Sequence, residues 1–184
     1  MKAPRVSRPK IPAGYGVSGE MQGALRWISV RRVLEGSLRY WIATSSNDDG
    51  PHIVQQWAGW VDDTLYFSGS DRTKWSRHLM NDPRAAVSIE RTGYSIMVEG
   101  RAECLSTVTP ELAAALMATF NKKYGYKTTP EDWTKGGLWA IHAHKVFAWK
   151  FAKMGTTATR FLFDQPGATA GSPSNRAPSA IRVS

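Results

Sequence analysis

Short turn signals separate most of the strand-like segments of this chain, and they restrict it to a fold built from hairpins. Asn, Asp and Gly in the turns NDDG, DDT and RTG tolerate the positive φ that tight hairpins need. Because such short turns join antiparallel strands, alternating βαβ units and a Rossmann sheet are not expected. The segments expected to form these strands, all rich in aromatic and β-branched residues, are 38–46, 51–61, 65–70, 85–90 and 94–105.

Helices and further strands are expected around these hairpins. Residues 23–36 and Arg72–Asn81 have apolar residues at helical spacing, and 109–125 combines an Ala/Leu/Met run with Gly125 as its stop. Residues 138–151 are expected to form one or two strands, and 159–163 a last short one. The predicted fold class is therefore mainly β with helices (α+β), an antiparallel barrel or strongly curved sheet with helices at its ends.

The charge of the chain lies partly outside its expected folded part. The net charge is +9, but residues 20–164 hold 18 basic and 15 acidic residues, which leaves only +3. Residues 1–19 and 165–184 contain no acidic residue and are rich in Pro, Gly and Ser. Both are expected to be disordered, solvated basic tails around one domain at 20–164. Nucleic-acid binding is therefore the less favoured explanation of the charge.

Membrane and secretory signals are missing from the sequence pattern. No apolar run approaches the length of a membrane span, and the first 20 residues have no apolar middle segment. Cys104 has no second cysteine with which to form an intrachain disulfide. We therefore expect a cytoplasmic protein without a membrane partner.

The segment LYFSGSDRTKWSRHLMNDP places two cations where a helix is already positive. Arg72 and Lys74 fall in the first turn of the expected helix, although cations are favoured at the other end. Ser68 and Ser70 add hydroxyl groups just before that helix. A phosphate bound at the helix N-terminus would explain the placement, and a solvated surface helix is the alternative.

Other motifs give weaker signals. The eight Trp residues are typical of core or interface positions, and an aromatic slot for a flat ligand is the sharper alternative. His142 and His144 share a face of a strand but have no evident carboxylate or thiol partner, so no metal site is expected. No G-x-S-x-G and no glycine-rich phosphate loop occurs, and the catalytic residues stay unassigned.

Taken together, these segments resemble the split-barrel flavoproteins related to pyridoxamine 5′-phosphate oxidase. They are most similar to the branch of that superfamily that uses the deazaflavin coenzyme F420. The resemblance spans roughly Leu25 to Phe163 and is carried by residues 39–90, MVEGRAE, KYG, VFAWKF and TRFLF. It implies an antiparallel six-stranded split β-barrel of the FMN-binding type, which forms a homodimer with shared cofactor sites.

The resemblance also implies which residues bind the cofactor. One set would hold the phosphate, and its members are Ser68, Ser70, Arg72 and Lys74. A second set lies on the strand under the isoalloxazine ring, and its members are Gln55, Gln56 and Trp57. The second subunit would supply Trp149 and Arg160, and Trp57, Tyr124 and Trp149 would line a pocket for the substrate.

Two departures from pyridoxamine phosphate oxidases proper bear on the cofactor. Thr73-Lys74 stands where those enzymes have Arg-Lys, and Trp57 stands where they have Lys. The spaced Arg-x-Lys is more similar to the deazaflavin branch. The resemblance thus implies an F420-dependent oxidoreductase that transfers hydride between its cofactor and a small organic acceptor. The alternatives are an FMN-dependent oxidoreductase, a non-catalytic flavin- or tetrapyrrole-binding protein, a nucleic-acid-binding barrel and a structural dimer.

Overall fold

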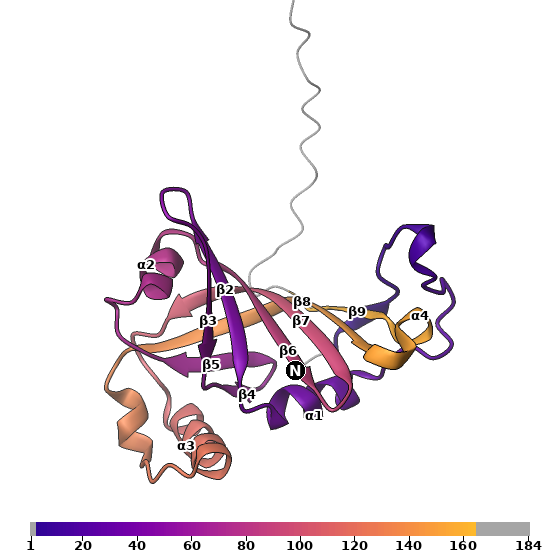
Figure 1. Ribbon diagram of the computed structural model, residues 1–184. Coiled ribbons are helices and arrows are strands. Elements are labelled where there is room, and N and C mark those ends of the chain that lie inside the picture. Colours follow the sequence, from indigo (N-terminus) through magenta and orange to yellow (C-terminus); the bar gives the residue numbers. More distant parts are fainter. Residues whose placement is uncertain (1–2, 165–184) are drawn as a thin grey trace, which may run out of the picture.

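The computed structural model of the protein describes residues 3–164. Its main element is a strongly curved sheet in which nine strands of this part of the chain pair antiparallel (Figure 1). The strand order is β1-β9-β8-β7-β6-β2-β3. Outside this order, β5 pairs with β8 and also with β4. β3 does not pair with β4 or β5, so the barrel stays open between them. This open antiparallel barrel confirms the predicted fold class.

The strands are β1 (Arg5–Ser7), β2 (Tyr40–Ser46), β3 (Gly50–Gln56), β4 (Gly59–Val61), β5 (Thr64–Ser68), β6 (Arg84–Arg91), β7 (Tyr94–Cys104), β8 (Leu138–Lys150) and β9 (Thr159–Leu162). The α-helices are α1 (Trp27–Gly36), α2 (Lys74–Asn81), α3 (Pro110–Tyr124) and α4 (Met154–Thr157), and the short 3-10 helices are η1 (Ala13–Tyr15), η2 (Pro130–Thr134) and η3 (Phe151–Lys153). No helix of the described residues is long and apolar enough to cross a membrane.

The two helices that lie next to the predicted site, α2 and α3, each begin at a threonine N-cap. The Thr109 side chain accepts a hydrogen bond from the N–H of Leu112 at the start of α3, and Gly125 ends the helix at a φ of 69°. At α2 the N-cap is Thr73, whose Oγ1 accepts from the N–H of Ser76 at 3.3 Å. The helix therefore starts at Lys74, and Arg72 precedes it rather than lying in its first turn.

The interior of the open barrel forms one apolar core, and a second one lies beneath α3. The first core packs side chains of the sheet against α1 and α2, and it includes Tyr40, Phe67 and Phe161, all 0% exposed. The second packs Leu116 and Phe120 of α3 against Tyr66 and the loop that carries η2. The central strands thus have an inward apolar side, as the alternation of β6 between buried and exposed residues shows.

The outward face of the sheet is left uncovered by the described residues. Large apolar side chains stand on it, with Trp41 46%, Ile53 59% and Met97 38% exposed. They belong to β2, β3 and β7, and β6 lies between β2 and β7 in the sheet. An exposed apolar surface of this extent is typical of an interaction site.

The N-terminal segment departs from the sequence prediction. Residues 1–19 were expected to be disordered, but Arg5–Ser7 form β1 and pair with β9. The Arg8 guanidinium donates to four carbonyl oxygens, those of Glu20, Gln22, Thr156 and Ala158, at 2.6–2.9 Å. These bonds tie the segment to the C-terminal part of the fold, and no local pattern could reveal partners about 150 positions away. The predicted tail 165–184 lies outside the described residues.

Two strand predictions are also corrected. The segments predict seven or eight strands, and the structure has nine within residues 3–164, because β1 was not expected and one expected strand is divided. The segment PHIVQQWAGWV was expected to be one strand, but it divides into β3 and β4 at Trp57 and Ala58. Trp57 turns outward there while Ala58 is buried, so the chain bends where the barrel opens.

Candidate functional site

The loop that leads into α2 is braced by its own polar groups. The Ser70 hydroxyl accepts a hydrogen bond from the N–H of Arg72 at 3.2 Å, and Thr73 Oγ1 lies 2.9 Å from the Ser70 carbonyl oxygen. Ser68 and Ser70 are both exposed. The loop therefore offers two exposed serine residues beside a capped helix N-terminus.

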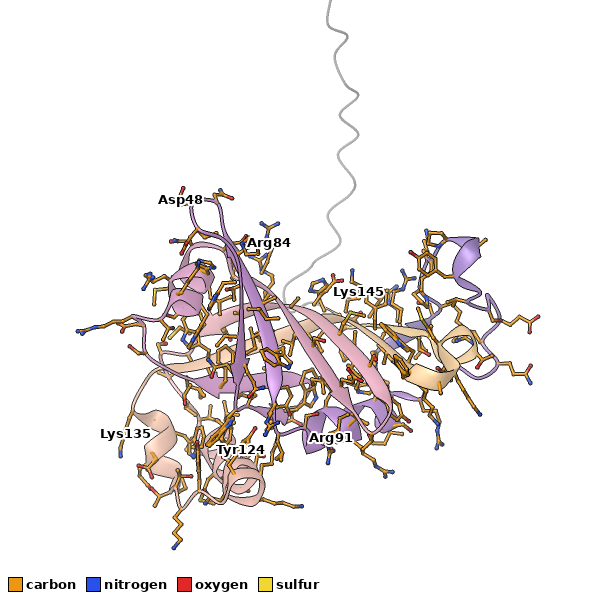
Figure 2. The ribbon with its side chains drawn as sticks, in the orientation of Figure 1. Asp48, Arg84, Arg91, Tyr124, Lys135 and Lys145 are labelled. Atoms are coloured by element: carbon orange, nitrogen blue, oxygen red, sulfur yellow. The ribbon has the colours of Figure 1, made fainter. Side chains whose placement is uncertain are left out.

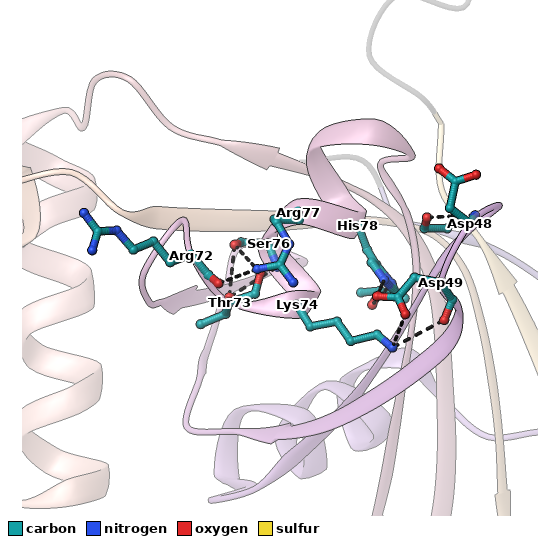
Figure 3. A network of polar contacts seen from close by, with 10 residues as sticks. Asp48, Asp49, Arg72, Thr73, Lys74, Ser76, Arg77 and His78 are labelled. Carbon is teal, nitrogen blue, oxygen red and sulfur yellow. Dashed lines mark hydrogen bonds and ion pairs between the residues drawn. The ribbon is translucent and has the colours of Figure 1, made fainter.

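Lys74 is turned toward the hairpin that joins β2 and β3 (Figure 3). Its Nζ donates to Asp49 Oδ1 at 2.9 Å and to the Asp49 carbonyl oxygen at 3.3 Å. The other carboxylate oxygen of Asp49 lies 3.4 Å from Nε2 of the buried His78. The hydrogen bonds from Lys74 and His78 lower the pKa of Asp49, so that carboxylate is ionised at neutral pH. In this structure an internal carboxylate thus occupies the position at Lys74 that was expected for a phosphate.

Arg72 does not join Lys74 in a common cradle. Its side chain is exposed and points away from that of Lys74 (Figure 3). The reason is local, because Arg72 lies before the N-cap whereas Lys74 is the first helical residue and is held by Asp49. The two side chains therefore do not form a shared anion-binding site in this structure. Their role in phosphate binding stays a prediction.

β3, the strand predicted to lie under the cofactor ring, is at the open edge of the sheet. β3 pairs with β2 alone, so the backbone groups along its other edge pair with no strand of the described chain. Gln55 is on the outward face and Gln56 on the opposite one, since side chains alternate along a strand. Trp57 is 52% exposed, and its ring stacks on that of Tyr124 with a centroid distance of 5.2 Å and an angle of 7°.

Tyr124 is itself fixed by hydrogen bonds at the end of α3. Its hydroxyl accepts from the N–H of Ala58 at 2.9 Å and lies 2.9 Å from the carbonyl oxygens of Leu38 and Ala58. The pair of Trp57 and Tyr124 therefore offers a firm, flat wall beside β3. The sequence suggested both residues as pocket aromatics, and the structure brings these two together.

Trp149 and Arg160 lie at the other side of the same sheet face. Trp149 lines a cavity of about 230 Å³ with Met97 and Phe147, and Arg160 Nε donates to Ser7 Oγ at 3.0 Å. The register places Arg160 opposite Phe147, Phe147 opposite Met97, and so on through Ser88 and Trp41 to Gln55.

The two groups of predicted residues are therefore far apart within one protomer. Five inter-strand steps separate Gln55 from Arg160, which corresponds to roughly 24 Å along the sheet at about 4.8 Å per step. Both side chains nevertheless lie in one cross-strand row and so share the outward face. One chain therefore holds the predicted residues in two separate groups, one on and beside β3 and the other on β8 and β9.

A larger hollow on the same face was not found from the sequence. It has a volume of about 730 Å³, and its floor is made of small residues such as Ala43, Ala86 and Gly100. Arg84, Arg101 and His144 stand around it. Arg84, Arg101 and His144 come from three strands, β6, β7 and β8, so only the sheet register brings them together.

A family model described as pyridoxamine 5′-phosphate oxidase matches residues 28–150, which is more than half of the chain. The chain belongs to the pyridoxamine 5′-phosphate oxidase family. The match covers β2–β8 and every predicted site residue except Arg160. It confirms the resemblance inferred from the sequence. No curated protein is similar enough in sequence to count as a relative.

Three solved structures show the same fold. A conserved hypothetical protein from Mycobacterium tuberculosis is 16% identical with a TM-score of 0.58, over 84% of this chain and 98% of that one. A FAD-binding protein from Mesorhizobium loti is 17% identical with a TM-score of 0.53, over 76% and 96%. A heme binding protein from Mycobacterium smegmatis is 19% identical with a TM-score of 0.51, over 65% and 52%. Similarity at this level shows the shared fold and leaves the ligand of this family member open.

Proposed function

We propose that the protein is a homodimeric oxidoreductase that binds the deazaflavin F420 and transfers hydride between this cofactor and a small organic acceptor. FMN is the alternative cofactor. The family supports a flavin-type cofactor in general. The spaced Arg72-x-Lys74 pair, which resembles the deazaflavin branch, supports F420 in particular.

The observation that carries the proposal is the single row of side chains from Gln55 to Arg160 on an uncovered sheet face. A two-fold axis that runs along the strands between β6 and β7 would lay β9 of a second copy over β3. The partner's Arg160 would then approach Gln55. The same packing would cover the exposed Trp41, Ile53 and Met97, which gives the dimer a hydrophobic driving force.

The residues present fit a flavin-type ring and its phosphate. The unpaired backbone edge of β3 can bond the polar edge of such a ring, as donors and acceptors alternate along it. The Trp57–Tyr124 stack provides a flat apolar wall, and Lys74 with the two exposed serines provides partners for a phosphate. When bound, the cofactor would supply the hydride chemistry. The protein would position the acceptor and, through the partner's Trp149, exclude water.

Lys74→Ala is expected to weaken cofactor binding by about tenfold or more, because a charge-assisted contact to the phosphate is lost. Titrations with F420 and with FMN, followed by tryptophan fluorescence, measure this change. Lys127→Ala is the matched control, since Lys127 is exposed and lies outside the site. Saturable quenching by F420 and not by FMN supports the proposed cofactor. Equal affinity of wild type and Lys74→Ala would contradict the placement of the phosphate.

Asp49→Asn is expected to strengthen binding of the phosphate-bearing cofactor by roughly threefold to tenfold. The substitution removes a negative charge 2.9 Å from Lys74 Nζ. Lys74 then no longer has to break an ion pair with Asp49 before it can bind the phosphate. The pH dependence of cofactor affinity follows from the pKa of Asp49. Because this pKa is lowered, Asp49 stays ionised until the pH falls below the usual range of an aspartate. Wild type should therefore gain affinity relative to Asp49→Asn as the pH falls through the pKa of Asp49. A variant that binds more weakly than wild type would show that Asp49 helps to position Lys74 instead.

A second candidate function, tetrapyrrole binding without turnover, is favoured by the hollow of about 730 Å³ on the sheet face. Small residues form its floor, while His144 is a potential iron ligand and Arg84 and Arg101 are suited to carboxylate groups. A titration with haem, followed by its Soret band, distinguishes this function from the first. A Soret shift that His144→Ala abolishes and Lys74→Ala leaves unchanged would favour it.

A further inference from the structure

A cavity of about 630 Å³ lies between α1, α3 and β4, away from the exposed sheet face. None of its lining residues belongs to the cofactor site described above. Its cationic side chains are those of Arg31, Arg32, Lys122 and Lys123, and its acidic ones are those of Glu35 and Asp62. Four positive groups therefore face two negative ones.

Most of this positive charge is not neutralised by ion pairs within residues 3–164. The only ion pair of the described residues among these groups joins Arg31 Nε to Glu35 Oε1 at 2.8 Å. Arg32, Lys122 and Lys123 form no ion pair within the part of the chain that the structure describes. The residues that line the cavity therefore carry a net positive charge.

Lys123 is held in the cavity wall by neutral groups. Its Nζ donates to the Tyr40 hydroxyl and to the Ala58 carbonyl oxygen, each at 2.8 Å, and lies 4.8 Å from the centre of the Tyr40 ring. These contacts fix the position of the ammonium group but supply no counter-charge. Its third N–H remains available to another acceptor.

Arg91 adds a further cation at this place. It lies at the end of β6, next to α1 (Figure 2), and its guanidinium rests on Gly36, where a Cβ would overlap it. Burial and then the charge of Arg91 lower the pKa of Lys123 to about 8, against a smaller opposite effect of Glu35. Two cations are therefore held near each other, and Glu35 offsets only part of the effect of Arg91 on Lys123, which costs free energy in the empty protein.

The carboxyl end of α1 does not account for these cations. Two of its last four carbonyl groups already have partners, because Val33 O accepts from Ser37 Oγ at 3.0 Å and Leu34 O accepts from the Tyr40 hydroxyl at 2.5 Å. A helix terminus carries only about half a unit of negative charge, which is less than the excess around the cavity.

An unpaired donor lies in the same wall. Trp60 lines the cavity and is 2% exposed, and its indole Nε1 has no hydrogen-bond partner among the described residues. The Asp63 carboxylate lies beside it, and its interactions with the indole N–H groups of Trp27 and Trp60 act to lower the pKa of Asp63 against the larger, opposite effect of burial. The Trp60 N–H therefore has an acceptor beside it within the protein, and the cations of the cavity carry the argument for a ligand.

We propose that this cavity binds a small organic polyanion that carries carboxylate or phosphate groups. Arg32, Lys122 and Lys123 bind its charged groups, and Arg91 adds long-range attraction. Leu38, Val61 and the Trp60 ring provide an apolar surface for its carbon skeleton. The site is separate from that of the cofactor, so the proposal does not depend on the proposed function.

Binding is linked to the protonation of Lys123. The groups that face this ammonium are Arg31, Arg32 and Glu35 from α1, Tyr40 from β2, Asp62 after β4, Arg91 from β6, and Lys122 and Tyr124 from α3. A bound polyanion favours the charged form, so it raises the pKa of Lys123 from about 8 and takes up a proton. Affinity is full below this pKa and falls by up to about tenfold as the pH rises to 9.

Isothermal titration calorimetry with citrate and with pyrophosphate tests the proposal on the full chain at constant ionic strength. Citrate also serves for the pH series, because it is fully ionised at both pH 7.4 and pH 9. We expect saturable binding, proton uptake in buffers of different ionisation heat, and a loss of about tenfold in Arg32→Ala and Lys122→Ala. A preference for citrate or for pyrophosphate assigns the ligand to the carboxylate or the phosphate class.

Two variants serve as controls, Lys127→Ala outside the cavity and Lys74→Ala in the cofactor site, and both should bind citrate as wild type does. Arg32 and Lys122 line the cavity rather than the core, so their variants are expected to fold, and circular dichroism checks this. The proposal is overturned if neither probe binds at millimolar concentration. It is equally overturned if Lys127→Ala weakens binding as much as Lys122→Ala does.

Discussion

Met97→Arg is expected to convert the protein from a dimer to a monomer. Met97 lies on β7, near the middle of the uncovered face, where the proposed axis brings two copies of β7 close together. An arginine there would bury an unpaired charge in each copy and place the two near one another. The dimer dissociation constant should rise by roughly a hundredfold or more, since such a charge costs about 3–5 kcal/mol. Sedimentation equilibrium measures it directly.

Met80→Arg provides the matched control for this change. Met80 is also an exposed methionine, 57% accessible, but it belongs to α2 rather than to the sheet face. It should leave the dimer intact. In Met97→Arg, cofactor affinity should fall together with the dimer, because the partner's Trp149 and Arg160 are lost. A Met97→Arg protein that stays dimeric, or a wild type that is monomeric at micromolar concentration, would refute the proposed interface.

Phe161→Ala is expected to lower the free energy of unfolding by about 3–5 kcal/mol. Phe161 is 0% exposed, lies opposite Val146 in the sheet, and packs on Trp27 with ring centroids 5.1 Å apart. Its loss would leave a cavity where β8, β9 and α1 meet. Chemical denaturation should show a lower midpoint with an unchanged slope.

Phe151→Ala is the control for the packing argument, because Phe151 is 73% exposed. Its effect should stay within about 0.5 kcal/mol. If both variants lost the same stability, the core at β9 would not be the source of the effect. The comparison also tests whether β9, which anchors β1, is a stable part of the fold.

Local chemistry made much of this architecture predictable. Thr109, Pro110 and Gly125 mark the ends of α3, since each satisfies or tolerates the backbone geometry of a helix terminus. Likewise, the NDDG and RTG turns predicted the pairing of β2 with β3 and of β6 with β7. These features depend on residues that are neighbours in the chain, so a sequence pattern is enough to reveal them.

The candidate site was only partly predictable, because its electrostatics depend on distant residues. The sequence indicated Lys74 as an anion partner, but Asp49, 25 positions earlier, is the anion that this lysine contacts. Arg72 was expected beside it and points elsewhere (Figure 3). No periodicity or spacing reports which of several nearby charges a flexible lysine will meet.

The sequence by itself determined the hairpins, the capped helices and the family resemblance, because each rests on short-range backbone preferences and on the order of residue types along the chain. Only the tertiary structure decided that residues 5–7 pair with β9, that Gln55 and Arg160 stand five strands apart on one face, and that cations from α1 and α3 surround a common cavity. These features arise from contacts between segments far apart in the chain. Sheet register and core packing establish such contacts, and local propensity carries no record of them.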